Sequence, residues 1–297
     1  MEIEIGFNMS SFRTSLGPML FLWDKERLDS FYKNVAQSDV DIVYLGESVC
    51  GKRRLSRLDD YLHWAQLLAQ SGKEVVLSTL ALLESPMQLK ELKRLCQADV
   101  ALFEANDLAA VQVLSELKLP FVIGPAINVY NGYTLMKLAK MGAKRWVMPV
   151  ELSRDWLVAL KAEFDSLCDL PMEFEVFSYG YLPLAYSARC FTARYYDLAK
   201  DQCNLICQDH PQGLTTLSQD NQELFTLNGI QTMSGKVYNL CEDVTDLAKV
   251  SDIARISAHQ FEDLAWIECF SLQQKNRRPA DHVNGFWHQI AGMQVVD

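Results

Sequence analysis

The sequence lacks the features that mark several large classes of protein. Its 38 acidic and 28 basic residues give a net charge of −10, which argues against a broad nucleic-acid surface. No window approaches the roughly 20 continuous apolar residues of a membrane-spanning helix. The first residues have neither the positive start nor the apolar run of a secretory signal. We therefore expect a cytoplasmic protein that does not span a membrane and does not bind nucleic acid.

Several familiar catalytic motifs are missing as well. The sequence has no glycine-rich phosphate loop, no nucleophile elbow around a serine and no HExxH element. The composition is otherwise ordinary, with 49% hydrophobic and 22% charged residues, as in most globular proteins. A length of 297 residues suits one large domain.

Short β-rich runs alternate with helical stretches along the chain. This alternation is typical of βαβ units around a parallel sheet. At least six units in series favour a TIM-like (β/α) barrel of the α/β class, with a doubly wound open sheet as the second choice. The expected strands are residues 3–7, 41–46, 74–80, 100–104, 121–123 (running on toward Tyr130), 145–149, 173–179 and 253–257, and the expected helices are residues 25–36, 58–71, 86–96, 108–117, 133–141, 154–164 and 261–274.

The pattern loosens after Pro171, which allows for an incomplete or distorted barrel. Cysteine, glycine, proline and tyrosine accumulate here, and residues 224–227 and 236–240 are expected to pair as two strands across a turn that contains Gly229, Ser234 and Gly235. No low-complexity linker divides the chain. We therefore expect a single barrel-type domain over residues 1–297, with an irregular cysteine-containing region toward its C-terminus.

Three of the eight cysteines lie close together in the sequence. Twelve residues separate Cys190 from Cys203, and three separate Cys203 from Cys207. If residues 197–208 form a helix, Cys203 and Cys207 lie on one face of it. In a reducing compartment such cysteines serve as metal ligands, reactive thiols or packing residues. The spacing indicates a cluster-binding segment near residues 180–210.

A 4Fe-4S cluster is held by four thiolates, so a fourth cysteine is needed. Cys50 is the best candidate because it follows the expected strand 41–46, at the end of a barrel where active sites lie. Basic neighbours stabilise such a negatively charged cluster, and Lys52, Arg53, Arg54 and Arg189 flank the proposed ligands. The candidate cofactor-binding and metal-ligating residues are Cys50, Cys190, Cys203 and Cys207.

Other interpretations of the cysteines remain open. Free cysteine is often buried as a small hydrophobe. Zinc is the rival metal, although its structural sites usually show close pairs on both sides and only one pair is close here. His210 either contributes to the site or lies at the surface. Cys96, Cys168, Cys241 and Cys269 have no partner spacing, and we assign them to packing.

Polar residues recur where the expected strands end. In a barrel these positions open on one face, so the side chains could bind a polar substrate. The alternative is that they cap the following helices. The residues are Glu47, Glu104, Asn106, Asn128, Asn131 and Glu151.

The chain resembles the collagenase-like peptidase family of the U class, and within it the branch that serves ubiquinone biosynthesis. The resemblance rests on residues 46–54, 119–121, 128–131 and 145–156 and on the spacing of Cys190, Cys203 and Cys207. Glu175, Phe177, Gly180 and Cys190 match the signature of the wider family. Pro183 replaces the earlier cysteine of that signature, a departure that weakens a peptidase interpretation.

The resemblance implies a specific function. It implies a 4Fe-4S cluster on the four cysteines, a heterodimer with the homologous subunit UbiU, and a lipid-binding accessory protein, UbiT. Such assemblies support oxygen-independent hydroxylation of the ubiquinone ring. A related family member uses prephenate as hydroxyl donor in tRNA modification, so we expect prephenate as the small-molecule hydroxyl donor here. The alternatives are a peptidase of the wider family and a non-catalytic partner subunit stabilised by its cluster. No residue of the sequence is assigned a catalytic role.

Overall fold

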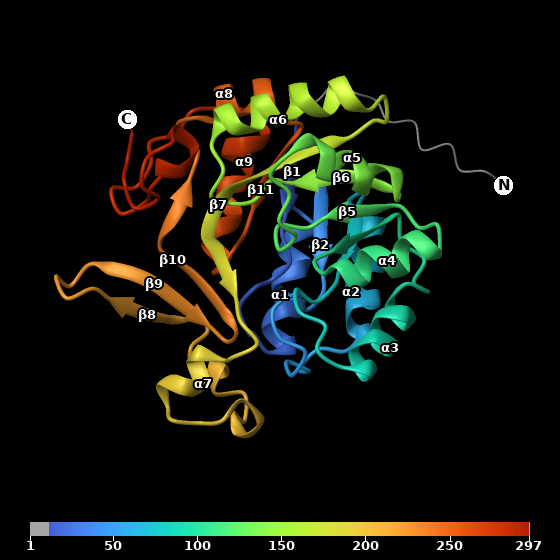
Figure 1. The fold of residues 1–297 in the computed structure, drawn as a ribbon. Coiled ribbons are helices and arrows are strands. Elements are labelled where there is room, and N and C mark those ends of the chain that lie inside the picture. The colour runs from blue at the N-terminus through green and yellow to red at the C-terminus, as the bar shows by residue number, and fades with distance from the viewer. Residues whose placement is uncertain (1–11, 297) are drawn as a thin grey trace.

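The computed structural model describes residues 12–296, and its central feature is a closed ring of eight parallel strands (Figure 1). The ring closes because β11 (Ile253–Ile256) pairs in parallel with both β1 (Arg13–Leu16) and β7 (Glu173–Tyr186). The strands between them are β2 (Ile42–Leu45), β3 (Glu74–Ser78), β4 (Leu102–Ala105), β5 (Phe121–Ile123) and β6 (Ala143–Val147). The prediction of a TIM-like barrel is confirmed, and the ring is complete. The expected strand at residues 3–7 lies outside the described residues.

Helices alternate with these strands. They are α1 (Lys25–Val35), α2 (Leu58–Gln70), α3 (Pro86–Leu95), α4 (Leu108–Glu116), α5 (Gly132–Lys140), α6 (Arg154–Leu167), α8 (Val244–Val250) and α9 (Ala265–Ser271). Polar side chains start most of them by accepting a hydrogen bond from a backbone N–H of the first turn. Asp24, Ser85, Asp107, Asn131 and Ser153 act in this way. Within residues 12–296, no helix is both long and apolar enough to cross a membrane.

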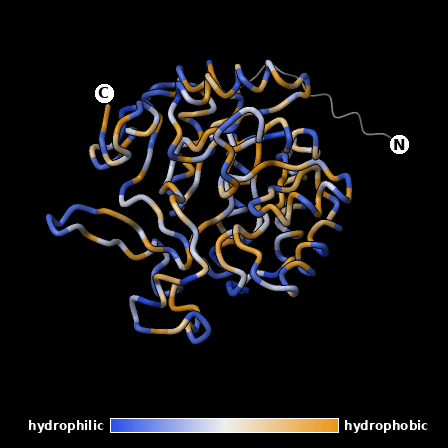
Figure 2. Tube along the Cα trace, viewed as in Figure 1, coloured by the Kyte–Doolittle hydropathy of each residue, from blue (hydrophilic) through white to orange (hydrophobic). Residues whose placement is uncertain are grey.

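The strands bury side chains on both faces, as expected of parallel strands covered by helices. In β2, Val43 and Leu45 pack in the large cluster shared with the helices, whereas Ile42 and Tyr44 belong to a second, smaller cluster. Because successive side chains of a strand point to opposite faces, the second set lies inside the ring. Figure 2 shows hydrophobic residues gathered along the barrel strands.

A buried ion network crosses the barrel interior. Arg145 is fully buried, and its Nη2 lies 2.8 Å from Glu74 Oε1 and 2.8 Å from Glu173 Oε2. Arg255 joins Glu175 and Glu104, each through a contact of 2.7 Å. Burial acts to raise the pKa of Glu175, but the charges of Arg255 and Arg145 outweigh it and lower that pKa below its usual value. The network therefore keeps the Glu175 carboxylate ionised inside the ring.

Residues 187–243, between β7 and α8, form an insertion into the barrel pattern. The insertion contains α7 (Phe191–Tyr195), two 3-10 helices (Lys200–Gln202 and Ile206–Asp209) and three strands, β8 (Leu214–Leu217), β9 (Glu223–Asn228) and β10 (Gln231–Asn239). β10 pairs antiparallel with β7 and with β9, and β9 pairs with β8. Figure 1 shows α7 and the β8–β9 hairpin projecting from the barrel, and the outer end of the hairpin is hydrophilic in Figure 2.

Several expectations for this region are wrong in detail. Residues 197–208 do not form a helix, because Asp197, Asn204 and Leu205 have φ values of 54°, 45° and 56°, in the left-handed region that interrupts a right-handed helix. The strand pair is longer than expected, and the turn between its strands lies at residues 229–230. Ser234 and Gly235 belong to β10 itself. The expected helix 261–274 is divided into a 3-10 turn, Phe261–Leu264, and α9.

Candidate functional site

The structure brings Cys50, Cys190, Cys203 and Cys207 to the wall of one small cavity of about 20 Å³. Cys50 comes from the loop after β2, Cys190 from the start of α7, and the other two from the pair of 3-10 helices. All four side chains are half-buried. The helix expected to align Cys203 with Cys207 is absent, but the chain path through the two 3-10 helices still carries both residues to the cavity.

The loop that carries Cys50 is held from inside. Glu47 Oε1 accepts hydrogen bonds from the backbone N–H groups of Val49 and Cys50, at 2.8 and 2.9 Å. Gly46 begins the loop with φ +140°, and a Cβ there would lie 2.4 Å from Ser78 O. Only glycine fits that position without strain. Glu47 therefore orders the Cys50 loop, a role that the strand-end pattern alone did not reveal.

Cys190 is the N-cap of α7. Its sulfur accepts a hydrogen bond from Ala193 N at 3.4 Å. The backbone N–H of Phe191 donates to Gly229 O, and Gly229 N donates to Thr192 Oγ1. These bonds anchor α7 to the turn between β9 and β10, so the insertion fixes the position of Cys190.

Two lysines attach the Cys203–Cys207 segment to the barrel. Lys52 Nζ donates to Lys200 O at 2.7 Å, and Lys200 Nζ lies 2.7 Å from Glu84 Oε2. His210 stacks on Tyr196, and its Nε2 is 2.6 Å from the tyrosine hydroxyl. His210 is not among the residues that line the cysteine cavity. Its contact with Tyr196 closes the base of the segment.

Arg53 is a buried cation whose charge acts on three of the four thiols. Burial raises the pKa of Cys50, Cys190 and Cys207, and the charge of Arg53 opposes this rise at each of them. The guanidinium is buried and donates to Leu20 O and Asn228 Oδ1, both at 2.7 Å. Its Nε has no hydrogen-bond partner within residues 12–296. The site therefore holds a fixed positive charge close to the thiols, and the guanidinium also hydrogen-bonds the Cys207 side chain.

The other basic residues expected to flank the thiols differ in their placement. Lys52 lines the cavity, as does Lys200, which was not among the expected residues. Arg54 is exposed and pairs with Glu91 at 3.0 Å, and Arg189 is exposed. Within the described part of the chain, no group of three or more His, Cys, Asp or Glu side chains is spaced to hold a single metal ion. The four thiols surround a cavity instead.

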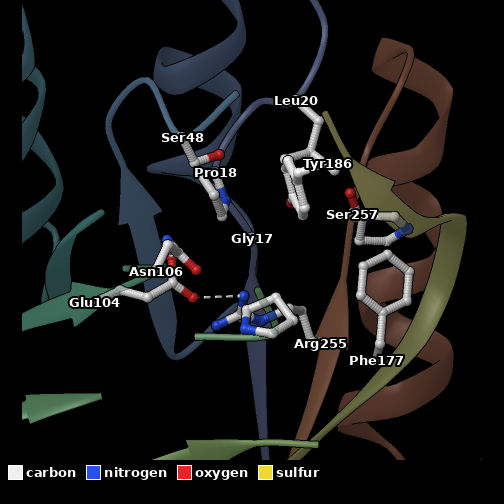
Figure 3. A pocket seen from close by; sticks show the side chains of 12 residues that line it. Gly17, Pro18, Leu20, Ser48, Glu104, Asn106, Phe177, Tyr186, Arg255 and Ser257 are labelled. Carbon is white, nitrogen blue, oxygen red and sulfur yellow. Dashed lines mark hydrogen bonds and ion pairs between the residues drawn. The ribbon is translucent and has the colours of Figure 1, made fainter. Parts of the chain in front are cut away.

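A second small cavity lies at the carboxyl ends of the barrel strands (Figure 3). Ser48, Glu104, Asn106 and Arg255 line it, and its volume of about 20 Å³ is enough for one water molecule. Ser48 Oγ and Arg255 Nη2 are buried without a hydrogen-bond partner among the described residues. Glu104 and Asn106 thus lie at the barrel face, as expected from their strand-end positions. Arg255 was missed, because a charge in a β-rich run such as 253–257 ordinarily indicates a surface position.

The remaining polar candidates lie elsewhere. Asn128 is exposed, Asn131 caps α5, and Glu151 is exposed and accepts a hydrogen bond from Tyr130 Oη. The cysteines assigned to packing are part of the core or pack against it, as expected: Cys96, Cys168, Cys241 and Cys269.

Comparison with known proteins gives one family and several distant structural neighbours. The model of peptidase family U32 matches residues 25–259. The U32 peptidase Mk0906 is 14% identical, over 85% of this chain and 95% of that chain, with a TM-score of 0.43. A dihydropteroate synthase from Anaplasma phagocytophilum is 9% identical, over 88% and 99% of the two chains, also with a TM-score of 0.43. These structural similarities are too low to carry an argument about function.

Proposed function

The chain belongs to peptidase family U32, and we propose that within this family it acts in the manner of UbiV, as an iron–sulfur subunit in the oxygen-independent hydroxylation of the ubiquinone ring. The observation that carries the proposal is the convergence of Cys50, Cys190, Cys203 and Cys207 on one cavity. Four cysteine thiolates are the usual ligand set of a 4Fe-4S cluster.

The residues present fit this cofactor chemically. The four thiols come from three segments, the loop after β2, the start of α7 and the Cys203–Cys207 segment, so they reach the cavity from different sides. Arg53 supplies a buried positive charge and the unpartnered Nε, and N–H groups near cluster sulfurs tune the reduction potential. The cavity of about 20 Å³ is small, so binding requires the Cys203–Cys207 segment to move outward. That segment consists of two short 3-10 helices joined by turns.

The roles of the chain's own residues follow from these contacts. Glu47 and α7 fix the positions of Cys50 and Cys190, while Lys52 holds the Cys203–Cys207 segment against the barrel. Arg53 offsets the negative charge of the thiolates. A bound 4Fe-4S cluster would supply one-electron transfer. Because all four cysteines serve as ligands, this proposal includes no open iron position for substrate.

The partners belong to the same proposal. We expect a heterodimer with the homologous subunit UbiU, a lipid-binding accessory protein UbiT, and prephenate as the hydroxyl donor. The insertion presents exposed aromatic side chains for such contacts: Phe191 is 41% and Tyr195 is 66% exposed. Exposed apolar groups of this kind often mark an interaction surface.

Family membership itself favours the alternative, a peptidase. Three residues of the family signature serve the barrel in this structure. Glu175 belongs to the buried ion network, Phe177 is buried, and Gly180 has φ +122° where a Cβ would lie 2.3 Å from Ser257 O. These roles are structural, so the signature residues do not by themselves support peptide hydrolysis.

The proposal is tested by purifying the protein without oxygen and measuring iron and labile sulfide per chain. The wild type should be brown, with broad visible absorption that bleaches on reduction, and Cys203→Ala should lose most of its iron. Cys168→Ala is the matched control, because Cys168 is also half-buried but lies outside the cavity. Unchanged iron in Cys203→Ala, or a colourless zinc protein, refutes the ligand assignment.

Function is tested separately in cells grown without oxygen. Loss of quinone formation in the Cys203→Ala strain, with normal formation in the Cys168→Ala strain, is the expected result. Peptidase activity that survives removal of the metal would favour the alternative from the wider family. Hydroxylation by the partner alone would reduce this chain to a non-catalytic subunit.

A further inference from the structure

A groove lies between α2 and α3, and it is far larger than the cysteine cavity. Its volume is about 420 Å³, within the range of about 300–1,000 Å³ found for small-molecule sites. The walls come from the first turn of α2, one face of α3, the end of β3 and the loops after β2 and β3. In Figure 1, α2 and α3 lie side by side on the outside of the barrel.

The floor of the groove is apolar. Leu77, Leu80, Leu83, Leu92 and Leu95 all line it. Leu77 and Leu92 are buried, whereas the other three leucines are half-buried and keep surface open to the groove. An apolar floor of this size binds an apolar group by removing it from water, at about 0.8 kcal/mol for each buried CH₂.

The rim of the groove is basic. Arg54, Arg57 and Arg94 line it together with one exposed acid, Glu91. Glu91 is paired with Arg54, and Arg94 makes only a distant contact of 3.8 Å with Asp59. The Arg57 guanidinium has no ion pair within 4 Å among residues 12–296. In a chain of net charge −10, this rim is complementary to an acidic group.

The groove also borders both cavities of the candidate site. Gly51 and Arg53 line the groove, and they follow Cys50 closely in the chain. Arg53 lines the cysteine cavity as well. At the inner end of the groove, Ser78 Oγ donates to Glu104 Oε2 at 2.7 Å, and Thr79 Oγ1 accepts from Asn106 N at 3.0 Å. Arg53 therefore separates a ligand in the groove from the cysteine cavity, and Ser78 and Thr79 separate it from the cavity at the strand ends.

We propose that this groove binds a small amphiphilic anion, with its apolar substituent on the leucines and its acidic oxygen, carboxylate or phenolate, at the rim arginines. The groove and its charge stand on the geometry alone. Identifying the ligand as the ring substrate rests on the proposed function, and it places that substrate on this subunit rather than on its partner.

Binding is tested by calorimetry on the purified full chain with three soluble probes. These are 4-butylbenzoate, 4-methylbenzoate and the cation 4-butylbenzylammonium. 4-Butylbenzoate should bind about 10- to 50-fold more tightly than 4-methylbenzoate, because it buries three further carbon atoms. It should also bind at least about 10-fold more tightly than the cation, because the rim is basic. Equal affinity of the acid and the cation overturns the proposal.

Two pairs of variants locate the site. Leu83→Trp fills the groove and should abolish binding of 4-butylbenzoate, whereas Leu89→Trp, on an exposed position of α3 outside the groove, should not. Arg57→Gln should weaken binding about 2- to 5-fold, as expected for an exposed ion pair. Arg277→Gln, an exposed arginine elsewhere, should leave it unchanged. Thermal unfolding checks that each variant is folded.

The outcomes separate this proposal from the proposed function. Normal binding of 4-butylbenzoate, together with iron content that does not depend on Cys203, would refute the cluster assignment and support the groove proposal. Normal iron content without binding of 4-butylbenzoate, or with binding that Leu83→Trp does not affect, would refute the groove proposal and leave the cluster assignment unaffected.

Discussion

The ion network inside the barrel makes a strong prediction about Arg145. This side chain is fully buried and donates three hydrogen bonds, to Glu173 Oε2 at 2.9 Å, to Tyr44 Oη at 3.0 Å and to Glu74 Oε1 at 2.8 Å. Replacing it with methionine keeps much of the volume but removes the charge. Acidic groups are then left in the interior with fewer cations.

The loss of unfolding free energy depends on which cations still pair with the acidic groups in the variant. Removing one partner of a buried ion pair costs about 3–5 kcal/mol. Arg13 still pairs with Glu74 and Glu173 in the variant, and Arg255 still pairs with Glu175. We therefore expect Arg145→Met to lower the free energy of unfolding by ~3 kcal/mol at pH 8, the lower end of that range. This is a large share of the total of about 5–15 kcal/mol for a typical protein.

The loss of stability should depend on pH. In the wild type the lowered pKa of Glu175 means that the network stabilises the fold above the unfolded pKa, and this stabilisation is lost as pH falls through the folded value. Without the charge of Arg145 the pKa of Glu175 rises, so protonation of Glu175 relieves the repulsion among the carboxylates at a higher pH. The difference between variant and wild type should therefore be smaller at pH 5 than at pH 8.

The assay is urea unfolding followed by tryptophan fluorescence at both pH values. Arg154→Met is the control, because its pair with Asp246 is partly exposed and should contribute no more than about 1 kcal/mol. The double variant Arg145→Met/Glu173→Gln should recover part of the loss, since it also removes one carboxylate. A loss below about 1 kcal/mol, or one that is equal at pH 5 and pH 8, would refute this account of the network.

Three further predictions concern the loops and the mouth of the barrel. Gly46→Ala should destabilise the protein by more than about 1 kcal/mol, the cost of a strained backbone position. Its loss should exceed that of Gly72→Ala, because a Cβ at residue 46 would collide with Ser78 O whereas residue 72 faces open space. Equal losses in urea unfolding would contradict the steric argument. Lys52→Met should speed proteolysis within residues 196–210 without lowering the unfolding midpoint of the barrel, because it removes the bond to Lys200 O; unchanged cleavage would show that this bond does not hold the segment. Burial acts to raise the pKa of Asp263, but its hydrogen bonds to His259 and Tyr179 lower that pKa overall. Asp263→Asn should therefore cost more stability at pH 7 than near pH 3, where the wild-type carboxylate is closer to protonation. A loss of stability that does not depend on pH would contradict this account.

The barrel could be predicted from the sequence because short stretches of sequence indicate its strands and helices one by one. Most of the buried strands are followed by a helix with its own start signal, such as Ser85 before Pro86 or Ser153 before α6. Boundaries for most of these elements agree with the structure to within a few residues. Closure of the ring was not local, since it depends on β11 pairing with both β1 and β7 across long stretches of sequence.

The four cysteines line one cavity, but one reason for expecting them to lie together was wrong. The helical spacing of Cys203 and Cys207 suggested a shared face, but the left-handed residues Asn204 and Leu205 break the helix between them. Asparagine tolerates this conformation and leucine seldom adopts it, so the break reflects the packing of the segment on the barrel rather than local propensity. The strand-end position of Cys50 was the more reliable signal.

The buried charges of the barrel interior and the groove could not be predicted from sequence patterns. Arg145 and Arg255 stand in β-rich runs where a charge ordinarily indicates a surface position, because nothing in a single sequence tells which face of a strand meets its partners across a ring. The leucines of the groove come from β3, a loop and α3. Only the fold brings them together.

Arg53 connects these features. It is buried, its charge acts on Cys50, Cys190 and Cys207, and it lines both the groove and the cysteine cavity. Its bonds to Leu20 O and Asn228 Oδ1 tie the barrel loop to the insertion. A ligand that places negative charge at the groove would share this one guanidinium with the thiolates. If the groove binds such a ligand, binding there would be coupled to the electrostatics of the cysteine site through Arg53, and the coupling would be reciprocal.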